Sequence, residues 1–244
     1  MLQQKKIARC PDQPSTKGET MKELLIFDLD GLLLDTEKIY FEGWLALFEK
    51  HQIPLSAEDI STWRGQSWQQ TADQLARVVG GHERVQTLRA EREGFIVTQL
   101  TNGALQMKPY AKETLALARE KGFTIALATS TMKERAAKLL THFDLVTAFD
   151  YMTFGDDVVA HKPDPAPYLL TLEKAGKTAD QALVMEDSLL GALAATRAGI
   201  DVVLIPDQSF PQTYTEADKA PLQLFAETDS LQFVYHLLQT NQLK

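Results

Sequence analysis

The stretch Leu24-Leu25-Ile26-Phe27-Asp28-Leu29-Asp30-Gly31 decides the fold, because an apolar run ends abruptly in two carboxylates one residue apart. The run is typical of a buried strand. Residues two apart in an extended chain point to the same side, so Asp28 and Asp30 converge if the strand continues through both. Two carboxylates about 4 Å apart repel by roughly 4 kcal/mol at an effective dielectric of about 20, a cost that Mg²⁺ offsets through its oxygen ligands. The simpler interpretation of this pattern alone is a strand end followed by an Asp-Gly turn.

The composition is that of a globular chain and excludes several function classes. Of the 244 residues, 44% are hydrophobic and 24% are charged, which is ordinary for a packed domain. The formal net charge of -8 offers no basic surface to nucleic acid or to an anionic membrane, so we expect neither as a partner. No apolar run reaches the ~20 residues that span a bilayer.

The cysteine content and the N-terminal segment favour a cytoplasmic protein. The single cysteine, Cys10, rules out an intrachain disulfide and fits a reducing compartment. Residues 1–20 are polar and lack the apolar segment of a secretory signal. We expect them to form a flexible N-terminal extension, since Met21 is a second candidate start directly before the first strand.

Residues 38–105 predict an all-helical block. Asp35 and Glu37 supply an N-cap and a first-turn acid to its first helix. Asn102-Gly103 marks a turn at its end, and no convincing strand falls between. Two pairs have the spacing of a capping box: Ser56 with Asp59, and Ser67 with Gln70.

The rest of the chain alternates helices with apolar strands. Helices are expected at Ala111–Lys121, Lys133–His142, Pro167–Ala175 and Leu190–Ala198, and strands at Phe123–Ala128, Phe149–Phe154, Ala182–Glu186 and Asp201–Ile205. Residues 206–220 are expected to form a loop, and residues 231–238 a final amphipathic helix. This alternation predicts a doubly wound α/β domain whose parallel sheet is covered on both faces and is interrupted after its first strand by the helical block.

Polar side chains follow four of the predicted strands, and parallel strands bring their carboxyl ends to the edge where ligands bind. Taken singly, each group has a structural interpretation: a helix cap, a solvated loop cation, or an acidic helix start. Taken together, the groups predict one active site. They are Asp28 and Asp30, Thr129-Ser130-Thr131, His161-Lys162-Pro163, and Glu186-Asp187-Ser188.

These four motifs resemble those of the haloacid dehalogenase-like phosphohydrolase superfamily. The stretches Phe27–Glu37 and Glu186–Gly191 are similar to its β-phosphoglucomutase-like branch. The resemblance implies a catalytic core of residues 21–37 and 106–244 with an inserted helical cap at 38–105. Ala166 stands where an acid is common in the family, a departure that bears on how Lys162 is oriented.

The resemblance also implies a role for each carboxylate. Asp28 would be the nucleophile that forms an aspartyl-phosphate, and Asp30 the general acid and base. Mg²⁺ would be held by a carboxylate oxygen of Asp28, the backbone carbonyl of Asp30 and the side chain of Asp187. Glu186 would either bind the ion directly or contact the groups that bind it.

Three groups would bind the oxygens of the transferring phosphoryl group: the Thr129 hydroxyl, the Ser130 backbone N–H and the Lys162 ammonium. In the cap, Arg64 is a candidate contact for a substrate phosphate or carboxylate, and a solvated loop arginine is an equal alternative. Trp63 and Trp68 are expected to pack within the cap rather than on a substrate.

The implied activity is that of a monomeric, Mg²⁺-dependent phosphatase acting on a small phosphorylated metabolite such as a sugar phosphate. The alternative is a phosphomutase of the same branch, which uses the same core residues and retains a bisphosphorylated intermediate. Such mutases commonly place a basic residue directly after the Gly-x-Ser of the cap loop, where this chain has Trp68. A catalytically silent binding module, the third class, would have lost a core group, and this chain has lost none.

Overall fold

The computed structural model describes residues 21–63, 68–207 and 214–243, and these divide into two compact units. The helical unit is Asp35–Gln106, and the sheet unit comprises the described residues on either side of it. The sequence analysis places the helical block at 38–105. The predictions for residues 1–20, Arg64 and Ser67 lie outside the described residues.

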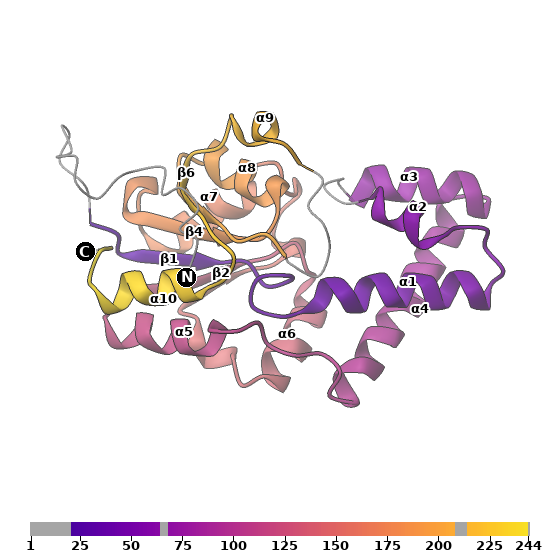
Figure 1. The fold of residues 1–244 in the computed structure, drawn as a ribbon, viewed down its shortest axis with the longest axis horizontal. Coiled ribbons are helices and arrows are strands. Elements are labelled where there is room, and N and C mark those ends of the chain that lie inside the picture. The colour runs from indigo at the N-terminus through magenta and orange to yellow at the C-terminus, as the bar shows by residue number, and fades with distance from the viewer. Residues whose placement is uncertain (1–20, 64–67, 208–213, 244) are drawn as a thin grey trace, which may run out of the picture. The chain divides into compact units, whose positions relative to one another are not determined.

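A parallel six-stranded sheet, with the order β3-β2-β1-β4-β5-β6, forms the centre of the sheet unit (Figure 1). The fully buried β1 lies between β2 and β4, so the apolar run of the deciding stretch occupies the middle of the sheet. The predicted doubly wound α/β domain is confirmed. The strands are β1 (Leu24–Phe27), β2 (Thr124–Ala128), β3 (Tyr151–Thr153), β4 (Ala182–Glu186), β5 (Asp201–Leu204) and β6 (Leu224–Glu227).

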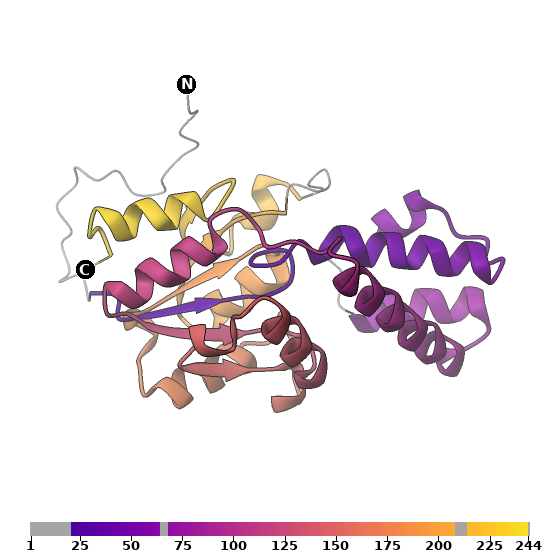
Figure 2. The same ribbon diagram turned by 90° about the horizontal axis from the view of Figure 1, so that it is seen from below.

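Helices cover both faces of this sheet. In Figure 1, α7 and α8 lie above β1, while α5 and α10 lie below it, and Figure 2 shows α5 and α10 side by side. Small residues of α8, among them Ala192 and Ala195, let it pack closely on Val184 and Val202. The helices of this unit are α5 (Ala111–Glu120), α6 (Lys133–His142), α7 (Ala166–Ala175), α8 (Leu189–Arg197), α9 (Glu216–Lys219) and α10 (Gln232–Gln239).

The helical unit has an apolar core of its own. Its helices are α1 (Thr36–Lys50), α2 (Ala57–Ser61), α3 (Trp68–Val79) and α4 (His82–Thr101). The ring of Trp63 lies edge-on to Trp44 at 5.9 Å, and the ring of Trp68 is stacked with Trp44 at 6.4 Å. Trp63 therefore packs within the unit, as predicted, whereas Trp68 stacks on Trp44 and is still 37% exposed. The capping box of Ser56 with Asp59 is also confirmed.

Three expectations of the sequence analysis are wrong. First, β1 ends at Phe27, and the chain then turns: the Leu33 N–H donates to the Leu29 carbonyl (3.0 Å) and Gly31 has φ 77°. Asp28 and Asp30 are therefore not brought together by a continuous strand. Second, the side chain of Asp35 makes no capping hydrogen bond, although Asp35 stands at the N-cap of α1.

Third, the region expected to be a loop contains α9, which begins with a capping box of Thr215 and Asp218, and β6 follows it. The sequence of β6, Leu-Phe-Ala-Glu, has no β-branched residue, and at the sheet edge most of it is only partly buried. Its pattern is therefore too weak to predict a strand. Among the described residues, we find no helix with the length and apolar character needed to cross a membrane.

Candidate active site

Apart from Arg64, which lies outside the described residues, the predicted site residues start from one edge of the sheet, at or just beyond the carboxyl ends of its strands. Asp28 is the first residue after β1, Thr129 the first after β2, and Glu186 the last residue of β4. Lys162 belongs to the loop that precedes α7. Because the strands are parallel, these side chains start from the same edge.

Lys162 is in direct contact with both acids. Its Nζ donates to Oδ1 of Asp28 (2.6 Å), to Oε1 of Glu186 (2.6 Å) and to the carbonyl of Ala128 (3.0 Å). An ammonium group has three hydrogens, so each has an acceptor here. The side chain is only 6% exposed. Lys162 is therefore a buried centre of the site, and the interpretation as a solvated loop cation is wrong.

Glu186 is held by donors on both of its oxygens. Oε1 also accepts from the Tyr168 hydroxyl (2.9 Å), and Oε2 accepts from the backbone N–H (3.1 Å) and hydroxyl (3.0 Å) of Ser188. A Cβ atom at Gly191 would lie 1.8 Å from Oε1, so the first turn of α8 can approach this carboxylate only as glycine. Ser188 also caps α8 by accepting from the Gly191 N–H (3.1 Å).

Burial and charge shift the pKa values of the three groups in different directions. Burial, together with the charges of Glu186 and Asp30, raises the pKa of Asp28 to about 7, against the opposing effect of Lys162. Burial alone would lower the pKa of Lys162, but Asp28 and Glu186 raise it well above its usual value. Burial acts against ionisation of Glu186, but Lys162 and the donors around it lower its pKa. The lysine is therefore a cation and Glu186 an anion.

Asp30 is bound by the loop after β2. The Thr131 hydroxyl donates to Oδ2 of Asp30, and Nη2 of Arg135 donates to the Thr131 hydroxyl (2.6 Å) and lies 3.7 Å from the same Oδ2. Thr131 is 4% exposed. The sequence predicts Thr131 at this edge without a specific role, and it does not point to Arg135 or Tyr168.

Thr129 and Ser130 do not cap α6, since the N-cap residue of that helix is Met132, without a side-chain capping bond. The buried Thr129 hydroxyl instead accepts from the Thr131 backbone N–H (3.0 Å). Ser130 is exposed, and a Cβ atom at Gly155 would lie 2.3 Å from its carbonyl oxygen. The loops after β2 and β3 therefore meet closely beside Ser130.

The donor chemistry of this edge fits a hard cation. Among the described residues there is no preformed group of three His, Cys, Asp or Glu side chains arranged around a metal position. Carboxylate oxygens nevertheless gather here, because Asp28, Asp30, Glu186 and Asp187 all belong to this edge. Two cations, Lys162 and Arg135, pair with three of these four acids, so the six groups together carry a net negative charge. Oxygen donors with an excess of negative charge suit Mg²⁺ better than a soft metal.

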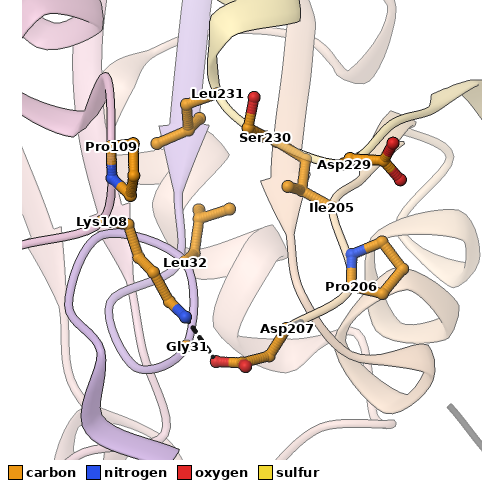
Figure 3. A pocket seen from close by; sticks show the side chains of 10 residues that line it. All are labelled: Gly31, Leu32, Lys108, Pro109, Ile205, Pro206, Asp207, Asp229, Ser230 and Leu231. Atoms are coloured by element: carbon orange, nitrogen blue, oxygen red, sulfur yellow. Dashed lines mark ion pairs between the residues drawn. The ribbon is translucent and has the colours of Figure 1, made fainter. Parts of the chain in front are cut away.

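A pocket of about 180 Å³ is lined in part by the loop that follows Asp30 (Figure 3). Its lining is largely apolar and includes Gly31, Leu32 and Leu231. Lys108 and Asp207 form an ion pair at its edge (2.9 Å), and the Lys108 N–H donates to the Leu33 carbonyl (2.8 Å). The backbone hydrogen bond holds the loop after Asp30 to the chain that returns from the helical unit, and the ion pair joins that chain to the segment after β5.

The sequence pattern of the haloacid dehalogenase-like hydrolases matches residues 25–205. The chain belongs to this family. A phosphorylated carbohydrates phosphatase from Thermotoga maritima is 33% identical over 182 residues, which are 73% of this chain and 82% of that protein. A phosphoglycolate phosphatase from Yersinia pseudotuberculosis is 31% identical over 176 residues, 71% of this chain and 76% of the relative.

A solved structure is also similar over nearly the whole length of both chains. It is a provisionally named β-phosphoglucomutase from Thermotoga maritima, with 28% identity and a TM-score of 0.71, covering 89% of this chain and 99% of the other. The relatives thus carry the names of both activities that the sequence analysis weighed. Family membership makes the chain a hydrolase of the phosphatase type.

Proposed function

We propose that this protein is a Mg²⁺-dependent phosphatase that hydrolyses a small phosphorylated metabolite, a sugar phosphate, through an aspartyl-phosphate on Asp28. The observation that carries the proposal is the contact of Lys162 with both Asp28 and Glu186 at the carboxyl edge of the sheet. A phosphatase must gather positive charge around a nucleophile and a dianion, and Lys162 places one cation directly beside the proposed nucleophile.

Asp28 is the group best suited to attack phosphorus. It follows the central strand directly, its backbone N–H donates to the Met185 carbonyl (3.2 Å), and it is 6% exposed. An anchored carboxylate loses little freedom on reaching an in-line geometry. Attack would form an aspartyl-phosphate while Asp30 protonates the departing alcohol, and Asp30 would then take a proton from the attacking water.

Lys162 would balance the charge that develops on the phosphoryl oxygens. Its side chain is held by Glu186, which is itself held by Tyr168 and Ser188. Both oxygens of Glu186 already accept hydrogen bonds from the protein. We therefore favour the role in which Glu186 contacts the metal-binding groups over the role in which it binds the ion directly. Thr129 and the Ser130 N–H remain our candidates for further phosphoryl contacts.

For Mg²⁺ we propose the carboxylate of Asp28, the backbone carbonyl of Asp30 and the side chain of Asp187 as ligands. When bound, the ion would supply charge neutralisation for the phosphoryl group. The net negative charge of the edge supports this assignment. A monomeric state and a cytoplasmic location remain predictions.

A phosphomutase is the second candidate, and one contact favours it. The guanidinium of Arg89 lies 4.4 Å above the ring of Trp68, the position at which mutases of this branch commonly have a basic residue. A cation therefore stands beside Trp68 within the helical unit, although the residue itself is not basic.

The test of the phosphatase proposal is phosphate release from a panel of phosphorylated metabolites, with Mg²⁺ or with excess EDTA. We expect the wild type to release phosphate only with Mg²⁺. We expect Asp28→Asn, which keeps the shape of the side chain but removes the nucleophile, to retain at most a few per cent of that turnover and to unfold at an unchanged temperature. Substantial turnover by Asp28→Asn would overturn the nucleophile, and full activity in EDTA would overturn the metal.

A further inference from the structure

The carboxylate of Glu186 accepts four hydrogen bonds, which fill the lone-pair sites of its two oxygens. Oε1 accepts from Nζ of Lys162 (2.6 Å) and from the Tyr168 hydroxyl (2.9 Å). Oε2 accepts from the backbone N–H (3.1 Å) and the hydroxyl (3.0 Å) of Ser188. Glu186 is 1% exposed, so water does not readily replace a donor that it loses. Its position therefore depends on all four donors.

Lys162 has no hydrogen left for a further acceptor. Its ammonium donates one hydrogen each to Asp28, to Glu186 and to the carbonyl of Ala128. A phosphoryl group that arrives on Asp28 would bring a fourth acceptor, and Lys162 can bind it only by giving up one of the other three. The contact that is given up decides where the ammonium stands during the reaction.

The contact with Asp28 is the one that the chemistry weakens. When the carboxylate of Asp28 bonds to phosphorus, the electron pair that carries its negative charge enters the new bond. The acyl oxygen that remains is neutral, and it is a weaker acceptor than a carboxylate. As long as Glu186 keeps its position, Lys162 stays on Glu186 and on the Ala128 carbonyl, and its third hydrogen turns from Asp28 to a phosphoryl oxygen.

Tyr168 contacts both members of the Lys162–Glu186 pair. Its hydroxyl donates to Glu186, and Nζ of Lys162 lies 5.0 Å from the centroid of its ring. Tyr168 is fully buried in the apolar core of the sheet unit, and its backbone N–H donates to the Pro165 carbonyl (3.0 Å) at the start of α7. A ring packed in this way keeps its hydroxyl at a fixed point beside the carboxylate.

We propose that Tyr168 is a positioning residue: its hydroxyl holds Glu186 in place, so that Lys162 exchanges its bond with Asp28 for one with the phosphoryl group and keeps its bond with Glu186. The proposal rests on the proposed phosphatase function. Without the hydroxyl, Lys162 is the donor left to Oε1 of Glu186 among the described residues, and the two charged groups shift together. A displacement of about 1 Å in such a group can cost about 100-fold in rate.

Tyr168→Phe tests this role, because it removes the hydroxyl and keeps the ring beside Lys162. With p-nitrophenyl phosphate and Mg²⁺, we expect kcat/KM to fall by about 10-fold. We also expect the inhibition constant of inorganic phosphate to rise, since a displaced ammonium binds phosphate oxygens less well. Tyr151→Phe, the same substitution at an exposed position of β3, is the matched control and should equal the wild type in both measurements.

A second substitution shows whether the hydroxyl acts through Glu186. In a Glu186→Ala background the carboxylate is gone, so adding Tyr168→Phe should lower kcat/KM by less than about 2-fold. If Glu186→Ala does not fold or turn over, Ser188→Ala supplies the background, because it removes another donor of the same carboxylate. The two lost donors should then reduce kcat/KM by more than the product of their separate reductions.

A Tyr168→Phe protein that is less stable but unchanged in kcat/KM and in phosphate inhibition would show a merely structural role and overturn the proposal. An equal loss with and without the carboxylate of Glu186 would also overturn it, as would independent effects of Tyr168→Phe and Ser188→Ala. Each of these results leaves the phosphatase activity of the wild type standing. If the wild type releases phosphate neither from p-nitrophenyl phosphate nor from the panel of metabolites, the proposed function itself fails, and the positioning role fails with it.

Discussion

Lys162 shows what a single residue contributes and how far its role can be predicted. The sequence predicted a lysine at a strand-end edge, since a basic residue follows the third strand in the chain beside a proline. The structure adds that the ammonium contacts both acids and lies 5.0 Å from the ring of Tyr168. Tyr168 could not be predicted as a site residue because it lies on α7, where an aromatic residue at helical spacing looks like any other residue of the hydrophobic core.

Thr131 was predicted at this edge without a role of its own, and Arg135 was missed. Arg135 is unremarkable in the sequence, and the joint contact of the two residues with Asp30 arises only when the loop after β2 and the start of α6 lie beside the loop after β1. Motifs predict the groups that take part in chemistry. The groups that orient them come from neighbouring elements, at spacings that a single sequence does not specify.

Gly191 provides a test at this scale, because the side chain of Glu186 occupies the space of its missing Cβ. We expect Gly191→Ala to displace Glu186, to weaken its contact with Lys162 and to reduce kcat by about 10-fold or more, with a loss of stability of about 1–3 kcal/mol from overpacking. Phosphate release and chemical unfolding measure the two effects.

The matched control is Gly94→Ala, the same substitution at an exposed position of α4 where a Cβ meets nothing within 4 Å. Alanine favours a helix over glycine by about 0.5–1 kcal/mol, so this variant should be slightly more stable and fully active. A fully active, stable Gly191→Ala protein would contradict the close approach of α8 to Glu186.

Among the elements, the buried ones were the most predictable. The helix at Lys133–His142 has the predicted bounds, and β2 and β4 differ from the predicted strands by at most one residue. These elements bury continuous or periodic apolar runs, and such runs have few alternative packings. The edge strand β3 was predicted too long, and the other edge strand, β6, was not predicted. Each pairs with only one neighbouring strand and is only partly buried, so its sequence is less constrained.

The contact of α1 with α4 gives the prediction at the scale of elements. A Cβ atom at Gly43 of α1 would lie 3.0 Å from Cγ of Arg92 and 3.1 Å from Cδ1 of Phe95, both on α4. We therefore expect Gly43→Val to force the two helices apart and to destabilise the helical unit by about 1–3 kcal/mol. Urea unfolding monitored by tryptophan fluorescence is a suitable measurement, since Trp44 is the next residue.

The control for that substitution is Ala46→Val, at an exposed position of the same helix. It carries the helix-propensity cost of valine, about 0.5 kcal/mol, without the crowding. Equal stabilities of the two variants would show that α4 does not approach Gly43 as closely as described.

At the scale of the whole molecule, each unit has its own core. One cluster draws on β1, β2, β4, β5, α7 and α8, all in the sheet unit, and another includes Trp44, Phe48, Leu75 and Leu88, all in the helical unit. The motif residues to which we assign the proposed chemistry all lie in the sheet unit. We expect the choice between hydrolysis and isomerisation to depend on the helical unit, where the sequence offers single residues such as Trp68 rather than a motif.

The experiment that decides this choice is incubation with β-glucose 1-phosphate, with and without glucose 1,6-bisphosphate. Since an indole cannot pair with a phosphate dianion as a guanidinium does, we expect free phosphate, little glucose 6-phosphate and no dependence on the bisphosphate. Rapid bisphosphate-dependent formation of glucose 6-phosphate would instead promote the phosphomutase. In that case Arg89→Gln, which removes the cation above Trp68, should abolish the isomerisation.

The central position of β1 has a consequence for the order of events on the ribosome. β1 is the first strand to be synthesised, yet both of its sheet neighbours lie beyond the helical unit in the chain. The four fully buried residues Leu24–Phe27 therefore emerge without a partner and stay so while the whole helical unit is translated. The helical unit has a core of its own and can fold during this time. A nascent chain whose translation stalls within that unit therefore carries an unpaired apolar strand. We expect chaperones to act first on this segment.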